Sequence, residues 1–123
     1  MANPPKEKMK TGTEGELLVQ LRLLEYGVQA AAPILDTGND LIGIKDGYVK
    51  FIQVKTSKVR MPARPQPNRI WDIVCLVKLE MDCTGELLLD QSKINILERD
   101  KPEKDELSQK LVNRIWADNP SRN

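Results

Sequence analysis

The chain has 123 residues, of which 40% are apolar and 30% charged, and its 19 basic and 18 acidic side chains leave a formal net charge of +1. These values are typical of a single water-soluble domain with an ordinary core. No apolar run approaches the roughly 18 residues that a membrane helix needs, and the first residues lack the apolar stretch of a signal peptide. We therefore expect neither a membrane protein nor an exported one, and assign the chain to the cytoplasm.

The chain contains no histidine. This excludes serine-histidine triads, histidine-dependent thiol proteases and zinc sites with histidine ligands. Its two cysteines, Cys75 and Cys83, are too few for a disulfide framework, which agrees with a reducing compartment. Any chemistry must therefore rest on carboxylates, amides, lysines and hydroxyls.

The first predicted element is a leucine-rich helix that follows a flexible N-terminal arm, residues 1–10. Thr13 and Glu16 have the spacing of a capping box, and Gly27 is expected to end the helix. Because apolar residues lie on more than one face of this helix, we expect it to be largely buried.

Three short strands are predicted next, at residues 29–34, 40–45 and 48–55. Asp46 and Gly47 separate the last two, and Asp-Gly between such runs is a strong signal for a two-residue hairpin turn. The three strands are expected to form an antiparallel meander.

Residues 58–69 are predicted to form a basic loop, because three prolines forbid a regular helix or a central strand there. From residue 47 to residue 71 the chain has no acidic residue, and its basic residues are Lys50, Lys55, Lys58, Arg60, Arg64 and Arg69. Such a run is either a solvated loop or a contact for the phosphate backbone of a nucleic acid.

The C-terminal half is predicted to contain a second hairpin. Strands at 70–80 and 86–89 flank a turn at 82–85, and a short helical turn near 92–97 and an amphipathic helix at 103–116 follow. One helix, a run of strands and later helices place the chain in the mixed α/β class.

We expect one domain at residues 11–118 and a C-terminal tail at residues 119–123. Trp71, at the start of a strand, is expected to be a core residue rather than a base-stacking one. Leu107, Leu111 and Ile115 on the last helix are expected either in the same core or at a subunit interface.

The turn at residues 46–47 sets the register of the first hairpin. It places residue 45 opposite residue 48, and the residue numbers of every further opposed pair must have the same sum. Asp40 falls opposite Gln53, and Lys55 lies on the same face. Opposed β-carbons are about 4.5–5.5 Å apart, which lets a carboxylate and an amide oxygen bind one cation. The register therefore predicts a polar site made of a carboxylate, an amide and an amine.

Each of these residues also has a structural explanation. Asp40 can end a turn, Gln53 and Lys55 can be exposed positions on an edge strand, and Glu16 can be half of a capping box. The coincidence of these groups in one register favours a chemical site.

The segments G-T-E-G-E at 12–16, D-T-G-N-D-L-I at 36–42 and F-I-Q-V-K-T-S at 51–57 resemble the PD-(D/E)XK nuclease superfamily. The Q-x-K ending is similar to the variant in group I intron homing endonucleases of that fold. The resemblance spans residues 11–57. It implies a restriction-endonuclease-like core with an N-terminal helix, a mixed β-sheet containing a three-strand meander, and a C-terminal helix.

The resemblance also implies a role for each site residue. Asp40 matches the central metal-binding carboxylate, Gln53 takes the place of the second acidic residue, Lys55 matches the motif lysine and Glu16 the helix glutamate. Asp40, the Gln53 side-chain oxygen and the Val54 carbonyl would hold Mg²⁺, with Mn²⁺ as a substitute. Because Gln53 is neutral, this pocket should bind the metal less tightly than one with two carboxylates.

The expected DNA contacts follow the motif lysine along the chain; they are Thr56, Ser57, Lys58, Arg60, Arg64 and Arg69. The hydroxyls of Thr56 and Ser57 are equally suited to cap the end of the strand.

The leading hypothesis is a Mg²⁺-dependent endodeoxyribonuclease of a homing, restriction-like or junction-resolving kind. The alternative is a catalytically degenerate nucleic-acid-binding module on the same fold, and the third is a structural subunit that does not bind DNA. Cutting both strands of a duplex requires two sites, so we expect a homodimer or a higher homo-oligomer.

Overall fold

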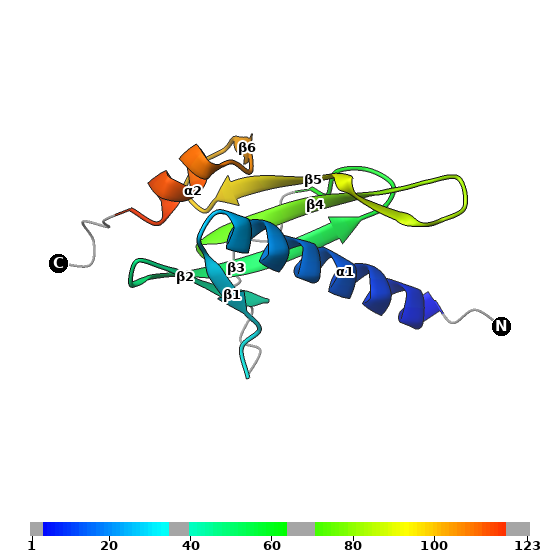
Figure 1. The fold of residues 1–123 in the computed structure, drawn as a ribbon, viewed down its shortest axis with the longest axis horizontal. Helices are drawn as coiled ribbons and strands as arrows, with labels where there is room; N and C mark the ends of the chain where they lie inside the picture. The colour runs from blue at the N-terminus through cyan, green and yellow to red at the C-terminus, as the bar shows by residue number, and fades with distance from the viewer. Residues whose placement is uncertain (1–3, 35–39, 64–70, 118–123) are drawn as a thin grey trace.

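The computed structural model describes residues 4–34, 40–63 and 71–117, with side chains from residue 7 onward. These residues form a six-stranded mixed sheet with a long helix before it and a short helix after it (Figure 1). The elements are α1 (Pro4–Glu25), β1 (Gln29–Ala31), β2 (Leu41–Lys45), β3 (Tyr48–Ser57), β4 (Ile73–Met81), β5 (Leu87–Glu98), β6 (Lys104–Glu106) and α2 (Gln109–Ile115). The expected arrangement of N-terminal helix, mixed sheet and C-terminal helix is confirmed.

The strands lie in the sheet in their order along the chain, from β1 to β6. All neighbours are antiparallel except β3 and β4, which run parallel. The first three strands therefore form the predicted meander. The parallel step requires the chain to return from the end of β3 to the start of β4, and residues 58–72 make this connection.

Helix α1 begins at Pro4 and not at Thr13. Residues 4–10 of the expected arm are therefore helical, and Thr13 and Glu16 lie inside the helix, where they form no capping box. Proline is tolerated in the first turn because the backbone N–H groups of that turn have no partner within the helix. Glu7, also in the first turn, carries the charge that the helix dipole favours there.

Gly27 ends α1 as predicted. Its φ of 92° lies in the left-handed region, and its N–H donates to the carbonyl of Leu24 at 3.0 Å. The next N–H, of Val28, donates to the carbonyl of Leu23 at 2.8 Å, which completes a Schellman motif.

Only one face of α1 is buried, so the expectation of a largely buried helix is wrong. The buried positions are Leu18, Val19 and Leu23, and the exposed ones are Leu17, Leu21 and Leu24, with exposed fractions of 58%, 47% and 60%. A helix that lies on a single sheet has an outer face with nothing to cover it. The leucine content therefore overestimated the burial.

Helix α1 approaches β3 very closely at Gly15. A β-carbon built on Gly15 would lie 1.8 Å from Thr56 Oγ1 and 2.8 Å from Thr56 Cβ. Only glycine fits at this helix position, and the contact fixes the distance between α1 and the end of β3.

The first hairpin has the predicted turn and register. Asp46 and Gly47 have φ values of 53° and 82°, as a type I′ turn requires. Lys45 pairs with Tyr48, and the ladder continues in that register as far as the pair Leu41 and Ile52.

The second hairpin joins β4 and β5 through the predicted turn at residues 82–85, where Asp82 Oδ1 accepts hydrogen bonds from the N–H groups of Thr84 and Glu86. The helical turn expected near 92–97 is wrong, because these residues belong to β5. Ser92, Ile94 and Ile96 are buried and alternate with more exposed residues, a period of two that indicates a strand.

The C-terminal helix is shorter than expected. Residues 104–106 form β6 on the edge of β5, and α2 begins after Ser108, whose Oγ accepts a hydrogen bond from the N–H of Leu111 at 3.1 Å. Leu111 and Ile115 are each 7% exposed and belong to the main core, so they contact this chain and not a second subunit.

The two faces of the sheet carry separate cores. Both helices contribute to the larger one, and the indole N–H of Trp116 donates to the carbonyl of Gly43 at 3.1 Å. The smaller core lies on the other face and consists of Trp71, Val74, Leu76 and Leu97, with Met61 packed against it. Trp71 is 2% exposed, so its predicted core position is confirmed.

Both cysteines are free thiols, as expected. Burial raises the pKa of the Cys75 thiol to about 12, so this group stays protonated near neutral pH. In the part of the chain that the structure describes, no helix is long and apolar enough to span a membrane.

We predict that Gly15→Ala destabilises the fold by roughly 1–3 kcal/mol, because the added methyl group overlaps Thr56. Gly12→Ala is the matched control on the same helix. A β-carbon at Gly12 meets nothing within 4 Å, so this change should stabilise the helix by up to about 1 kcal/mol. Urea denaturation of the two variants measures both effects, and equal shifts would contradict the close contact.

We also predict a pH-dependent contribution from Glu98, which joins β5 to α2. Burial raises the pKa of Glu98, but the hydrogen bonds and charge of Arg114, at 3.1 and 2.6 Å, and the charge of Lys101 outweigh it and hold the pKa below the ordinary 4.5. The carboxylate therefore stabilises the fold above pH 4.5 and loses this effect as the pH falls below that value.

Glu98→Gln should accordingly lower the free energy of unfolding at neutral pH and have a smaller effect in acid. Denaturation of both proteins across this pH range tests the prediction, with the exposed Glu103→Gln as control. A difference between wild type and Glu98→Gln that does not change with pH would contradict it.

Candidate functional site

The candidate site lies beside the first residue of β2, where the pairing of β2 with β3 stops and β3 continues. The β2–β3 ladder stops at the pair Leu41 and Ile52, whereas β3 extends to Ser57. Backbone N–H and C=O groups of alternate residues point to the same side of a strand. Those of Ile52 point toward β2, so those of Val54 point to the same side, where β2 no longer pairs with β3. The sheet therefore has an open backbone edge at this point.

Asp40 lies at this edge, one residue beyond the ladder. Its N–H donates to the carbonyl of Ile52 at 2.8 Å, and its Oδ2 accepts a hydrogen bond from the N–H of Val54 at 2.7 Å. Asp40 therefore contacts the residues on either side of Gln53. This hydrogen bond occupies one carboxylate oxygen. It gives the Val54 N–H a partner at a position where no neighbouring strand pairs with β3 on this side.

Gln53 is buried on a central strand. It is 7% exposed, and its Oε1 accepts no hydrogen bond from any residue that the structure describes. The alternative of an exposed edge position is therefore wrong for Gln53. An unpaired buried acceptor costs about 1–3 kcal/mol, a cost that a bound ligand would remove.

Lys55 lies two residues after Gln53, and its side chain is exposed. Alternation along β3 places the two side chains on the same face of the sheet. This face is the one opposite α1, because the intervening residues Ile52 and Val54 contact the core that α1 covers.

These residues offer the oxygen ligands that Mg²⁺ prefers. The Asp40 carboxylate, the Gln53 amide oxygen and the Val54 carbonyl are all hard donors, and the unpaired Gln53 oxygen fits a ligand position. Within residues 4–34, 40–63 and 71–117, no three or more histidine, cysteine, aspartate or glutamate side chains are grouped as a metal site. A metal here would have to rely on amide and carbonyl oxygens beside the carboxylate.

Two glutamates of α1 flank the contact with β3. Glu16, the predicted helix glutamate, is half-buried and follows Gly15, which touches Thr56. Glu14 was missed by the sequence analysis; its Oε1 is buried and lies 3.6 Å from Lys58 Nζ. Glu14 precedes the buried Leu18 by four residues, so the two lie on the same face of the helix. This spacing indicates from the sequence that Glu14 faces the sheet.

The predicted DNA-contacting residues fall into different environments. The hydroxyl of Thr56 is buried against α1. Ser57 Oγ accepts hydrogen bonds from the N–H groups of Val59 at 3.1 Å and Arg60 at 3.3 Å, which favours its role as a strand cap. Lys58 forms an ion pair with Glu14 of α1, and Arg60 is exposed.

Three further predictions fall outside the described residues: Arg64, Arg69 and the C-terminal tail at 119–123.

Asp72 is a second carboxylate that fixes β3. Its Oδ2 accepts a hydrogen bond from the N–H of Phe51 at 2.7 Å, and its own N–H donates to the Phe51 carbonyl at 2.8 Å. Asp72 therefore binds both backbone groups of one residue on the β4 side of β3, whereas Asp40 binds two residues, Ile52 and Val54, on the other side. The sequence analysis gave Asp72 no role, since only the parallel pairing of β3 and β4 places it there.

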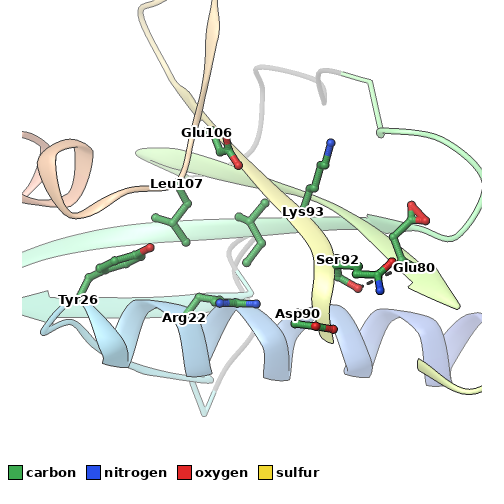
Figure 2. Close-up of a pocket in the computed structure, with 10 residues that line it drawn as sticks. Arg22, Tyr26, Glu80, Asp90, Ser92, Lys93, Glu106 and Leu107 are labelled. Atoms are coloured by element: carbon green, nitrogen blue, oxygen red, sulfur yellow. Dashed lines mark hydrogen bonds between the residues drawn. The ribbon is translucent and has the colours of Figure 1, made fainter. Parts of the chain in front are cut away.

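A pocket of about 600 Å³ lies elsewhere, between α1 and β5. Figure 2 shows Arg22 of α1 and Tyr26, which follows α1, facing it, with Asp90, Ser92 and Lys93 from β5. Side chains of both charge signs line it, so it selects no one class of ion. None of the candidate site residues is among those lining it.

Comparison with known proteins gives one similar solved structure, that of the bacterial homing endonuclease I-Ssp6803I. The alignment has a TM-score of 0.48 and 14% sequence identity, and covers 81% of this chain and 77% of that one. No protein-family model matches the chain. No curated protein matches it either.

Proposed function

We propose that the protein is a metal-dependent endonuclease that hydrolyses phosphodiester bonds in DNA. The observation that carries this proposal is that Asp40 binds the two residues that bracket Gln53, Val54 through its carboxylate and Ile52 through its backbone N–H, while the amide oxygen of Gln53 is buried without a partner among the described residues. Lys55 adds a cation on the same strand. A carboxylate and a neutral oxygen can hold a divalent cation, and an amine can stabilise the charge that develops on a phosphoryl group during hydrolysis.

In this proposal Asp40, Gln53 and the Val54 carbonyl would hold Mg²⁺. When bound, the cation polarises the phosphate and lowers the pKa of a coordinated water. Lys55 positions the attacking water and stabilises negative charge on the phosphoryl group. Glu16 lies on α1, which covers the opposite face of the sheet from Gln53 and Lys55, so its proposed role of orienting a water would apply at the open edge of β3.

The hydrogen bond from Val54 to Asp40 prepares the site before any ligand arrives. It fixes the carboxylate against the backbone at 2.7 Å and leaves the second carboxylate oxygen outside that bond. A carboxylate held by a strand needs little reorganisation to bind a cation.

DNA would reach the site along the basic segment that follows β3. Lys58 and Arg60 lie in its described part, and both are close in sequence to Lys55. Their charges would bind backbone phosphates without sequence preference. A second subunit would supply the second cut in a duplex, which makes a homo-oligomer the expected active form.

A nucleic-acid-binding module without catalysis is the second candidate, and the neutral Gln53 favours it. Without a second carboxylate, the site attracts a divalent cation less strongly. Such a module would bind DNA in a salt-sensitive way that is indifferent to Mg²⁺.

We predict Mg²⁺-dependent cleavage of DNA that Asp40→Asn and Lys55→Ala each reduce by at least about 100-fold, the scale on which removing a charge-stabilising group acts. Asp40→Asn is the sharper variant, because the asparagine oxygen can still accept the Val54 hydrogen bond while the charge is lost. Gel assays on supercoiled, linear and branched DNA measure the rate.

Asp90→Asn and Lys93→Ala are matched controls, since both residues are exposed on β5 and line the separate pocket of Figure 2. They should cleave at the wild-type rate. Cleavage that persists without metal, or that survives Asp40→Asn, would contradict the proposal.

We predict further that Gln53→Glu tightens Mg²⁺ binding by about 10-fold or more, because it adds a negative charge beside Asp40. Without metal the same change should destabilise the fold, since a buried carboxylate would replace a buried amide. Calorimetric titration and thermal denaturation with and without Mg²⁺ measure the two effects. An affinity unchanged from wild type would argue against a metal at Gln53.

A further inference from the structure

A hollow of about 420 Å³ lies between the first half of α1 and the end of β3. From α1 it is lined by Lys8, Thr11 and Gly12, and from β3 and the turn after it by Val54, Lys55 and Lys58. Val54 and Lys55 also belong to the candidate site, so the two are contiguous. We refer to this hollow as the α1–β3 pocket.

Lysines outnumber acidic residues among those that line the α1–β3 pocket. Three lysines line it, and Glu7 is the acidic residue among the lining residues. Lys58 is held by its ion pair with Glu14, at 3.6 Å, which has side-chain exposures of 27% and 21% for the two residues. Lys8 is exposed and lines the pocket from α1, whereas Lys55 lines it from β3 and its side chain leaves the strand on the face opposite α1.

The backbone of α1 leaves room for a ligand. A β-carbon on Gly12 would meet nothing within 4 Å, whereas one on Gly15, a turn further along, would collide with Thr56. The helix is therefore in contact with β3 at Gly15 and stands away from it at Gly12. The hydroxyl of Thr11, also among the lining residues, is a hydrogen-bond donor suited to an anion.

We propose that the α1–β3 pocket binds a backbone phosphate of the nucleic acid, next to the phosphate that is hydrolysed, and that Lys8 is a main contact. This inference rests on the proposed function. It assigns nucleic-acid binding to the first turns of α1, a segment that the sequence analysis treated as an arm. A phosphate seated here positions the strand across the edge of β3, where Asp40 and Lys55 lie.

Two variants test the pocket in different ways. Lys8→Ala removes one charge, and Lys110→Ala removes the same charge from exposed α2 as its control. Gly12→Met fills the open space with a good helix former and leaves the charge unchanged, and Gly12→Ala is its control. None of these residues is assigned to the catalytic site.

The readout is fluorescence anisotropy of a labelled mixed-sequence DNA duplex, with EDTA to prevent cleavage, between about 50 and 200 mM salt. Lys8→Ala should weaken binding by about 10-fold and lower the slope of log K against log salt by about 1, as loss of one phosphate contact predicts. Gly12→Met should weaken binding by a similar factor. The two controls should bind like wild type.

The outcomes separate this inference from the function on which it rests. If wild type binds the duplex but Lys8→Ala matches Lys110→Ala and Gly12→Met matches Gly12→Ala, the pocket is not a phosphate site. If wild type fails to bind the duplex even at the lowest salt, the nuclease proposal fails and the pocket assignment fails with it. Circular dichroism of each variant checks that the fold is retained.

Discussion

The central constraint in this structure is that β3 extends several residues beyond its last pair with β2. Each backbone N–H beyond Ile52 on that side needs a partner, and the carboxylate of Asp40 supplies one for Val54 at 2.7 Å. On the opposite side Asp72 does the same for Phe51. Two aspartates thus anchor one strand from its two sides, and the edge of β3 that β2 leaves open, beyond Asp40, is where the candidate site lies.

The local parts of this arrangement can be predicted from the sequence, because they depend on neighbouring residues. Asp46-Gly47 fixes a type I′ turn, the turn fixes the register, and the register brings Asp40 to the position of Gln53. Gly27 ends α1 for an equally local reason. The meander and the mixed sheet follow from these elements, and they agree with the expected restriction-endonuclease-like arrangement.

The remaining features depend on contacts between segments that are distant in sequence. The parallel pairing of β3 with β4 places Asp72 beside Phe51, and no local pattern indicates it. The 92–97 segment contains enough apolar residues for a helix, but pairing with β4 makes it a strand. The exposed leucines of α1 look like core residues in the sequence, because residue type alone does not reveal that the helix lies on a single sheet.

The neutral Gln53 has an electrostatic consequence for the proposed enzyme. With a second carboxylate, the metal ligands would repel the phosphate until the cation bound. With glutamine, the Asp40 charge is balanced by Lys55, Lys58 and Glu14 form a neutral pair, and Glu7 offsets Lys8, so these residues leave the edge of β3 close to neutral rather than negative. In the proposed enzyme, such a site would repel the nucleic acid less than one with two carboxylates, and the phosphate would supply the negative charge and the oxygen that the metal pocket lacks. Metal binding would then depend on the presence of substrate, which would restrict hydrolysis to DNA that is already seated across the strand.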